Sequence, residues 1–467
     1  MIKKIIFFIT VIAIILFLGR NLNPFSSLMF EFHDATQPAR IQQFTLNLKQ
    51  LNIPPRVAPD FNFKKGYPVF NFYAPFSYWL TSLINLIGFD IVSSLKLSFL
   101  FAILTAFFGS FVFLNGFFDF YPSLLGGVFY ITSLYFPVDI FVRGNLAEIW
   151  FLALFPWGFY FIIKNSKRLT KLEFFFGVLI LSFLFTSHNI YSLISIPLII
   201  IFILLLKNKK PNLMMIGLAI LLSSYFWLPA LMEMKYIIAQ QMAAKTNFRD
   251  HFLCLFQLWQ SPWGFGGSTP GCVNDGISFK IGKLQIIFFV LGILLFLYKL
   301  FIKKNKLNKV SLFFIIYSLL FLFLTIYQSQ SIWELFSPVL SVFQFPWRFI
   351  GLSLLGISFL SSYFFDQIKF LGKNFVVLVL ITAALIINGK YFSGQEIKKS
   401  VFEKKYLSQK YIENVAALKI PEYFPKDNVR IDYGRTTIKK TGNILSLITI
   451  IGLFIWTILR KKPSYQP

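Results

Sequence analysis

The feature that most constrains the fold is a series of long apolar runs that recurs from one end of the chain to the other. The chain has 467 residues, of which 56% are hydrophobic and 19% are aromatic. A helix needs about 20 apolar residues to cross the roughly 30 Å hydrocarbon layer of a membrane. The sequence therefore predicts an all-α polytopic membrane protein. The runs cover residues 5–19, 92–115, 120–140, 147–163, 173–206, 213–232, 283–301, 310–327, 349–365, 374–388 and 443–459.

The formal charge is +26, but the basic residues do not form a basic surface on a soluble domain. We therefore expect no nucleic-acid partner. The cations instead gather in short hinges between apolar runs, as the positive-inside rule predicts for cytoplasmic loops. We read the N-terminus as cytoplasmic and residues 5–19 as an uncleaved first span. The hinges hold Lys164, Lys167, Arg168 and Lys171; Lys207, Lys209 and Lys210; Lys299, Lys303, Lys304, Lys306 and Lys309; Lys369 and Lys373; and Arg460, Lys461 and Lys462.

All hinges fall on the cytoplasmic side only if the chain makes about twelve spans, with 173–206 counted as two and 73–89 lying at the outer surface. We then expect a transmembrane module over 1–388, with outer loops 20–72 and 233–282. An extracytoplasmic loop follows over 389–442, in which 422–425 and 429–433 suggest a short strand pair. A last helix and cytoplasmic tail occupy 443–467. Every polar cluster then faces outward from the plasma membrane, which indicates an active or binding face there.

The first outer loop holds the most unusual polar residues, Glu31, His33 and Asp34, directly after the first span. From Asp34 onward, apolar and polar residues separate onto two faces of a helix, with Arg40 on the polar face. We expect an amphipathic helix lying on the membrane surface. Asp34 could simply cap this helix, Glu31 could be a solvated loop charge, and His33 could sit at the lipid headgroups.

Residues 59–75 alternate aromatic side chains with Asp60, Lys64, Lys65, Asn71 and several glycines and prolines. Aromatic rings stack on the C–H face of sugars, and amides bond to their hydroxyl groups. The stretch therefore fits sugar recognition, or an aromatic belt at the membrane interface.

Several motifs, in this order along the chain, resemble the bacterial membrane proteins called 6-pyruvoyl-tetrahydropterin-synthase-related. That family is similar in turn to the GT-C superfamily of integral membrane glycosyltransferases. The motifs are His33-Asp34, Pro38-Ala39-Arg40, Ile53-Pro54-Pro55-Arg56, Pro59-Asp60, the string 66–75, Arg143-Gly144 with Ala147-Glu148, Ser187-His188-Asn189, Phe345-Pro346-Trp347-Arg348 and Glu422-Tyr423-Phe424-Pro425.

The resemblance implies a GT-C-like fold and transfer of a sugar from a polyprenyl-phosphate donor to a glycan, lipid or protein acceptor. It implies that Asp34, in the first outer loop, is the catalytic base, a role that His33 could share. Arg40, Arg143 and Arg348 are candidates to hold the lipid phosphate, and Lys64 and Lys65 could do so more loosely. Glu31, Asp60, Asn71, Glu148 and His188 are further site candidates.

Structural roles stay open for several of these residues. Arg143 and Glu148 could be an ion pair at the end of a span, and Arg348 could be an interfacial anchor. His188 could be a buried histidine bonded to a neighbouring helix. Cys254 and Cys272, in one outer loop, could pair or remain free thiols. We expect no cofactor and find no clustered metal-ligand motif, although the resemblance leaves a divalent metal site open.

Two other functions remain open. A transporter or flippase of lipid-linked sugars should carry polar residues near the middle of its spans, yet 283–301, 310–327 and 443–459 are almost purely apolar. Polar residues at span ends favour surface chemistry instead. A non-catalytic component of envelope assembly with the same fold is the third possibility.

Overall fold

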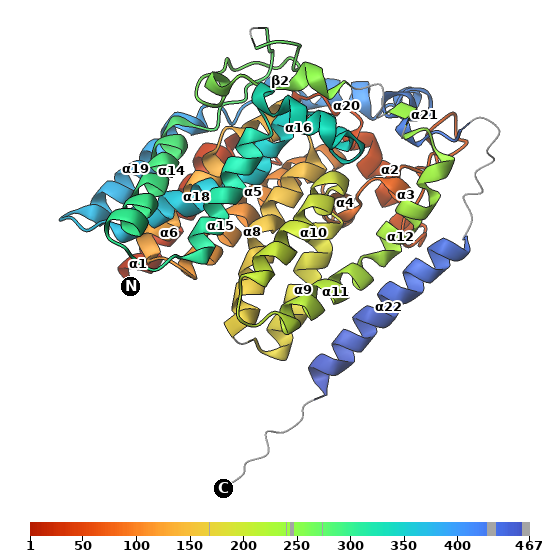
Figure 1. The fold of residues 1–467 in the computed structure, drawn as a ribbon. Coiled ribbons are helices and arrows are strands. Elements are labelled where there is room, and N and C mark those ends of the chain that lie inside the picture. The colour runs from red at the N-terminus through yellow and green to blue at the C-terminus, as the bar shows by residue number, and fades with distance from the viewer. Residues whose placement is uncertain (168, 240, 243–246, 273, 427–435, 460–467) are drawn as a thin grey trace.

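The computed structural model describes residues 1–467 except 168, 240, 243–246, 273, 427–435 and 460–467 (Figure 1). Most of the described chain is helical, as expected from the apolar runs. The helices are α1 (Ile2–Leu18), α2 (Gln37–Lys49), α3 (Val69–Phe72), α4 (Phe76–Leu86), α5 (Ile91–Asn115), α6 (Phe120–Thr132), α7 (Tyr135–Pro137), α8 (Leu146–Lys167), α9 (Lys171–Phe185), α10 (Asn189–Leu204), α11 (Lys210–Leu222), α12 (Ser224–Glu233), α14 (Lys283–Leu297), α15 (Lys309–Phe323), α16 (Gln330–Leu335), α17 (Ser337–Leu340), α18 (Phe349–Gln367), α19 (Lys373–Gly389), α20 (Lys399–Tyr406), α21 (Gln409–Asn414) and α22 (Thr437–Ile458).

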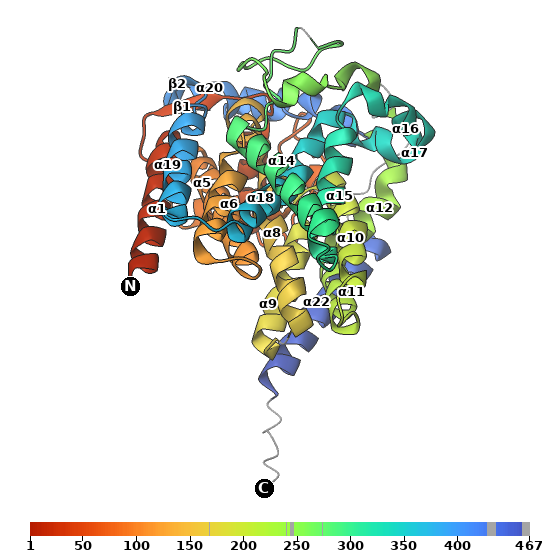
Figure 2. The ribbon, with the colours of Figure 1, turned by 60° about the vertical axis from the view of Figure 1, so that its left-hand side comes forward.

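The long polar loops gather at one end of the helical body, which we call the loop end (Figures 1 and 2). It holds residues 20–72 and 389–426 and the described parts of 233–282. A two-stranded antiparallel sheet joins the first and last of these segments, since β1 (Leu28–Glu31) pairs with β2 (Gln395–Lys398). Ion pairs of 2.6 Å also link Lys405 to Glu31 and Lys399 to Asp90. The first outer loop and the segment 389–426, which are far apart in sequence, are therefore joined to each other at the loop end.

The N-terminus and the predicted basic hinges lie at the opposite end of the body (Figure 2). Lys171 Nζ donates to the carbonyl oxygen of Trp456 at 3.1 Å, which joins the α8–α9 hinge to the end of α22. Lys299 Nζ donates to Gln367 Oε1 at 2.5 Å, which joins the hinge after α14 to the end of α18. The separation of plain lysines from the polar loops agrees with the predicted asymmetry. Arg168, Arg460, Lys461 and Lys462 lie outside the described residues.

The prediction of twelve spans is not confirmed. Among the described residues, six helical segments are long and apolar enough to cross a membrane, and a seventh qualifies if α11 and the following helix, bent by 65°, form one span. The helices over the other runs are shorter, such as α1 with 17 residues and α9 and α15 with 15 residues. Helix α4 has 11 residues, too few for a full crossing, in keeping with the expectation for 73–89.

The enclosed helices are those that carry the unusual polar residues. The most apolar stretch of 120–143 is entirely buried, and 89% of the corresponding stretch of 346–367 is buried. By contrast, only 22% of the stretch in 283–302 and 17% in 437–458 are buried, so these two helices turn most of their apolar surface outward. Outward apolar surface is suited to lipid, whereas polar groups need protein partners.

Helix α2 does not lie exposed on a surface, and in this respect the prediction is wrong. Both its apolar and its polar face are buried, and Arg40 and Gln43 are each 1% exposed. The polar face is buried because a loop of the same chain satisfies it. Gln43 Nε2 donates to Asp60 Oδ2 at 2.9 Å, and Asn47 Nδ2 donates to the Val57 carbonyl oxygen at 2.8 Å. The polar pattern therefore marked a packing surface within the protein.

Two local predictions in the loops have different outcomes. Cys254 and Cys272 form a disulfide with their Cα atoms 5.7 Å apart, which decides between the two alternatives. In the predicted strand pair, Glu422 and Tyr423 belong to a short 3₁₀ turn over Pro421–Tyr423, and 429–433 lies outside the described residues.

Candidate functional site

The connection between α6 and α8 builds a group of buried charges at the loop end. The π-helical turn Val138–Arg143 ends at Gly144, whose φ of 64° lies in the left-handed region. A Cβ atom at Gly144 would lie 2.1 Å from the Phe32 ring, so the close approach of the first outer loop requires glycine here. This sharp turn brings Arg143 back over Glu148 in the first turn of α8. We call Asp139, Arg143, Glu148, His188 and Arg348 the buried charge cluster.

Glu148 is the centre of this cluster and is fully buried. Its carboxylate accepts hydrogen bonds from Arg143 Nη2 at 2.8 Å, Asn145 Nδ2 at 2.9 Å and the Tyr191 hydroxyl at 2.7 Å. The Tyr135 hydroxyl donates to it as well. A buried carboxylate is stable only when such partners replace water, so these donors account for its burial.

Arg143 lies between two carboxylates. Nη1 donates to Asp139 Oδ1 at 2.5 Å, and Nη2 donates to Glu148. The guanidinium also lies over the Trp347 ring, 4.7 Å from its centroid. The ion pair with Glu148 is the structural role that the sequence left open. With both terminal nitrogens committed, Arg143 is a weaker candidate for holding a phosphate than the sequence suggested.

His188 and Arg348 flank Glu148 from two other segments. His188 Nε2 lies 3.9 Å and Arg348 Nε lies 4.0 Å from Glu148 Oε2. His188 begins α10, where its Nδ1 accepts from the Tyr191 backbone N–H at 3.3 Å. Burial lowers the pKa of His188 to about 3, despite the nearby Glu148 charge. His188 is therefore neutral at physiological pH, with Nε2–H directed towards the carboxylate side of the cluster.

Asp34 is held beside this cluster by the backbone. The amide of Asp34 donates to the Arg143 carbonyl oxygen at 2.9 Å, and the amide of His33 donates to that of Val142 at 2.9 Å. Two consecutive bonds fix the first outer loop against the π-helical turn. The sequence places Asp34 and Arg143 more than 100 residues apart, and the structure makes them neighbours.

The side chain of Asp34 does not cap α2, since Thr36 occupies the N-cap position and no side chain caps the helix. The Asp34 carboxylate instead forms an ion pair with Arg40 and accepts from Thr36 Oγ1 at 2.9 Å and Gln37 Nε2 at 2.8 Å. Its side chain remains 26% exposed. An oriented and partly accessible carboxylate meets the geometric needs of a general base.

Arg40 is almost fully buried, with its guanidinium 4.9 Å from the centroid of Tyr73 and 5.8 Å from that of Tyr78. Burial works to lower the pKa of Arg40, but Asp34, Tyr78 and Tyr73 together outweigh it and hold this pKa well above its usual value. Burial raises the pKa of Tyr73 to about 12, while the charges of Arg40 and Arg348 both oppose that rise. Tyr73 is therefore exposed to the charge of both arginines.

Both arginines carry unused hydrogen-bond donors. Within the described part of the chain, Nε and Nη1 of Arg40 and Nε of Arg348 are buried without a hydrogen-bond partner. A buried donor without a partner costs about 1–3 kcal/mol, and more when it is charged. Arg40 lies against Tyr73 and pairs with Asp34, so an anion that reached its free donors would satisfy buried N–H groups beside the Asp34 carboxylate.

The described part of the loop 233–282 packs against the segments that carry His33 and Trp347. His33 Nε2 donates to the Phe265 carbonyl oxygen at 2.8 Å, and Trp347 Nε1 donates to Ser268 Oγ at 3.3 Å. The Cys254–Cys272 disulfide closes the segment that contains both contacts. His33 is exposed and directed at this loop, whereas Asp34 turns towards Arg40.

The remaining candidates lie outside the cluster. Glu31 pairs with Lys405, and Lys64 pairs with Glu413 at 2.9 Å. Asp60 bonds to Gln43 of α2, Asn71 donates to Glu233 Oε2 at 2.8 Å, and Lys65 is exposed.

The sequence did not single out three residues of this region. They are Asp139, which belongs to the buried charge cluster, and Tyr135 and Tyr191, which bond to Glu148. Asp139 stood inside a run read as apolar, at the i−4 position to Arg143. A carboxylate within an apolar helix needs a partner, and this spacing offers one, so the signal was present. Nothing in the sequence around either tyrosine marks it as a partner of Glu148. Within the described residues, no three His, Cys, Asp or Glu side chains lie close enough together to hold a metal ion.

Known proteins resemble this chain in family and in fold. A family model described as a 6-pyruvoyl-tetrahydropterin synthase related domain, membrane protein, matches residues 70–394. That range includes Arg143, Glu148, His188 and Arg348 and leaves out Asp34. No curated protein matches the sequence.

Two solved structures share the fold at low sequence identity. The arabinofuranosyltransferase AftD from Mycobacteria has a TM-score of 0.51 at 12% identity, covering 82% of this chain and 26% of that one. The apo oligosaccharyltransferase of Archaeoglobus fulgidus has a TM-score of 0.53 at 12% identity, covering 96% of this chain and 64% of that one. This chain thus spans about a quarter of the first and under two thirds of the second. The likeness shows that this chain shares the fold of these two proteins.

Proposed function

This chain belongs to the 6-pyruvoyl-tetrahydropterin synthase related family of membrane proteins, and from that premise we propose that it is a membrane glycosyltransferase. The proposed reaction moves a sugar from a polyprenyl-phosphate donor to an acceptor hydroxyl at the outer face of the plasma membrane. The fold shared with an arabinofuranosyltransferase and an oligosaccharyltransferase supports the class of reaction. The choice of donor and the role of each residue rest on the site itself.

The observation that carries the proposal is the set of unused guanidinium donors beside an available carboxylate. Arg40 and Arg348 offer three buried N–H groups without partners, and Asp34 is held next to them by Arg40 and by the backbone of Arg143. A phosphate group would satisfy these donors, and guanidinium groups bind phosphate oxygens well. The donors are enclosed, so entry of a phosphate requires the covering segments to separate.

In the proposed mechanism, Asp34 takes the proton of an acceptor hydroxyl as its oxygen attacks the anomeric carbon of the donor. The bond from that carbon to the phosphate oxygen breaks, and the phosphate leaves with the bonding electrons. Arg40 and Arg348 would stabilise the charge that develops on the leaving phosphate. The ion pair with Arg40 orients the Asp34 carboxylate within the site.

The buried charge cluster has a supporting role in this mechanism. Glu148 holds Arg143, and the Arg143 carbonyl oxygen holds the amide of Asp34. The Tyr191 hydroxyl lies 2.7 Å from Glu148 Oε1 and 2.6 Å from the Arg348 carbonyl oxygen, and its single proton is shared between these two acceptors. One buried carboxylate is thus connected to the segments that carry both the proposed base and one phosphate-binding arginine.

The test is an Asp34→Asn variant in membrane vesicles supplied with a panel of labelled polyprenyl-phosphate sugars. Wild type should transfer label from at least one donor, and Asp34→Asn should lower the rate at least about 100-fold. The matched control is Glu396→Gln, which removes an exposed carboxylate at the same end of the molecule and should retain full transfer.

The outcomes separate the competing functions. Full transfer by Asp34→Asn would remove Asp34 as the base. Movement of the labelled lipid across the vesicle membrane without sugar transfer by wild type would indicate a flippase. Neither movement nor transfer across the panel would favour a non-catalytic component of envelope assembly.

A further inference from the structure

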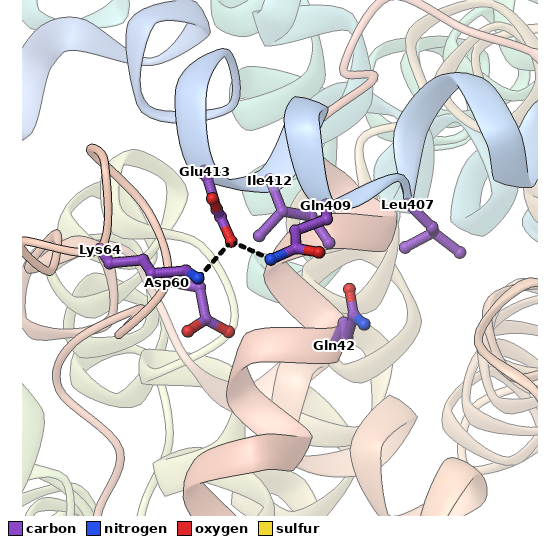
Figure 3. Close-up of a pocket in the computed structure, with 7 residues that line it drawn as sticks. All are labelled: Gln42, Asp60, Lys64, Leu407, Gln409, Ile412 and Glu413. Atoms are coloured by element: carbon purple, nitrogen blue, oxygen red, sulfur yellow. Dashed lines mark hydrogen bonds and ion pairs between the residues drawn. The ribbon is translucent and has the colours of Figure 1, made fainter.

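A cavity of about 230 Å³ opens at the loop end, away from the buried charge cluster. It lies between α2, the loop around residues 60–64 and the segment of α20 and α21. In Figure 3, Gln42 reaches up from α2 towards Gln409 on α21, while Asp60 and Lys64 stand on the other side. The cavity is lined by Gln42, Asp60, Lys64, Leu407, Gln409, Ile412 and Glu413.

The lining offers hydrogen bonds in both directions. Glu413 accepts from Lys64 Nζ at 2.9 Å and from Gln409 Nε2 at 2.7 Å, which fixes both of these side chains at the rim. Asp60 is fixed by Gln43, which donates to its carboxylate and accepts from its backbone amide at 2.8 Å. The Gln42 Oε1 atom is buried and has no hydrogen-bond partner in the described part of the chain.

The charge of the lining selects against phosphate. Two carboxylates surround a single lysine, and that lysine is already paired. The hydrogen bond and charge of Lys64 lower the pKa of Glu413, so this carboxylate stays ionised. A neutral polyol satisfies such a site, since its hydroxyl groups donate to carboxylates and amide oxygens and accept from amide N–H groups. Leu407 and Ile412 add an apolar wall suited to the C–H face of a ring.

The cavity is connected to Asp34 by two structural elements. On α2, Arg40 pairs with Asp34, and Gln43, one turn further on, bonds to Asp60 in the lining. On α21, the pKa of Tyr411 is sensitive to Asp34 and Arg40, while its neighbours Ile412 and Glu413 line the cavity. Both elements therefore run from the proposed base to the cavity.

We infer that this cavity binds one neutral sugar unit of the acceptor, the unit next to the residue whose hydroxyl group is attacked. The inference rests on the proposed function for its meaning, and the binding that it requires can be measured without transfer. The volume suits a single ring, because cavities for drug-sized ligands begin at about 300 Å³. The acceptor is accordingly a glycan or a glycolipid.

The experiment is saturation-transfer NMR on the full chain in lipid nanodiscs. The probes are methyl glycosides of common hexoses and pentoses in pyranose and furanose forms, with inorganic phosphate as the comparison ligand. Wild type should bind at least one glycoside with a millimolar dissociation constant. Gln409→Ala and Gln42→Ala should each weaken that binding about fivefold, because each removes hydrogen bonds to the sugar. Gln395→Ala, an exposed glutamine on the neighbouring β2, should bind as wild type does.

The outcomes distinguish this inference from the proposed function. Asp34→Asn should bind the glycoside normally while failing to transfer, and glycoside binding without any transfer would refute the proposed function alone. If the wild type transfers sugar but Gln409→Ala and Gln42→Ala both leave glycoside binding unchanged, the cavity is not the acceptor subsite. Absence of binding by any glycoside, or stronger binding of phosphate, would also overturn the inference. The unfolding temperature of each variant shows that the chain remains folded.

Discussion

Glu148→Gln should destabilise the protein more than any other single change in the buried charge cluster. The carboxylate is fully buried and accepts hydrogen bonds from Arg143, Asn145, Tyr135 and Tyr191. A glutamine offers one acceptor oxygen and turns an N–H group towards donors. It also removes the charge that compensates Arg143. Breaking a buried ion pair by neutralising one partner costs about 3–5 kcal/mol.

The same geometry predicts a smaller effect at the other carboxylate of the cluster. Asp139 Oδ1 accepts from Arg143, but Oδ2 is buried without a partner in the described residues. Asp139→Asn leaves Arg143 paired with Glu148, so we expect a loss of about 1–2 kcal/mol. The ratio of the two losses tests the hydrogen bonding, because both variants replace a fully buried carboxyl group by an amide of the same shape.

The assay is the apparent unfolding temperature of purified protein in one detergent at a fixed heating rate. With about 2 cal/mol/K per residue, a chain of 467 residues shifts by about 1 °C for each kcal/mol. Glu148→Gln should thus lower the unfolding temperature by about 3–5 °C and Asp139→Asn by about 1–2 °C. The control Glu396→Gln, which changes an exposed carboxylate, should shift it by less than about 1 °C.

A double variant tests whether the loss comes from an unpaired charge. Replacing both partners, as in Arg143→Met with Glu148→Leu, should cost less than the sum of the two single changes, since neither Arg143 nor Glu148 is then left buried without the other. Equal losses for Glu148→Gln and Asp139→Asn, or strict additivity of the double variant, would refute the assignment of Glu148 as the centre of the cluster.

Two further predictions concern pH and orientation. Burial lowers the pKa of His188 to about 3, below the value of about 6.5 expected in the unfolded chain, so the unfolded state binds the extra proton between these values. The stability that neutral His188 supplies is fully present above about pH 6.5 and falls as pH drops towards 3; His188→Gln should flatten this part of the unfolding temperature profile, and an unchanged slope would contradict the burial. Cysteines introduced at Asp90 and Ser166 lie at opposite ends of the molecule, so a membrane-impermeant thiol reagent added outside cells should label the first and spare the second. Equal labelling of both would overturn the proposed orientation.

The helical content followed from the sequence because helix formation in an apolar run depends on local chemistry. Each predicted run forms helix in the structure, and lysines at the hinges lie at the ends of those helices. The number of spans did not follow, because several helices stop after 15 to 17 residues where polar turns such as Thr186-Ser187-His188 begin. Helix ends depend on capping and packing as well as on hydropathy.

The candidate site was predicted in part. The sequence singled out Asp34, Arg143, Glu148, His188 and Arg348, since charged groups at the ends of apolar runs are rare and need partners. It could not show that Arg143 donates hydrogen bonds to two carboxylates, or that Asp34 pairs with Arg40 and does not cap α2. These facts depend on which segments meet.

The sequence by itself determined that this is a helical membrane protein with its unusual polar residues gathered on one side, because hydrophobic burial and charge placement act locally along the chain. The tertiary structure alone decided the pairing within the buried charge cluster, the burial of α2 and the cavity between α2 and α21. Those features arise from contacts between segments up to several hundred residues apart. A hydrogen bond or ion pair depends on distances of a few ångströms, which the order of residues does not specify.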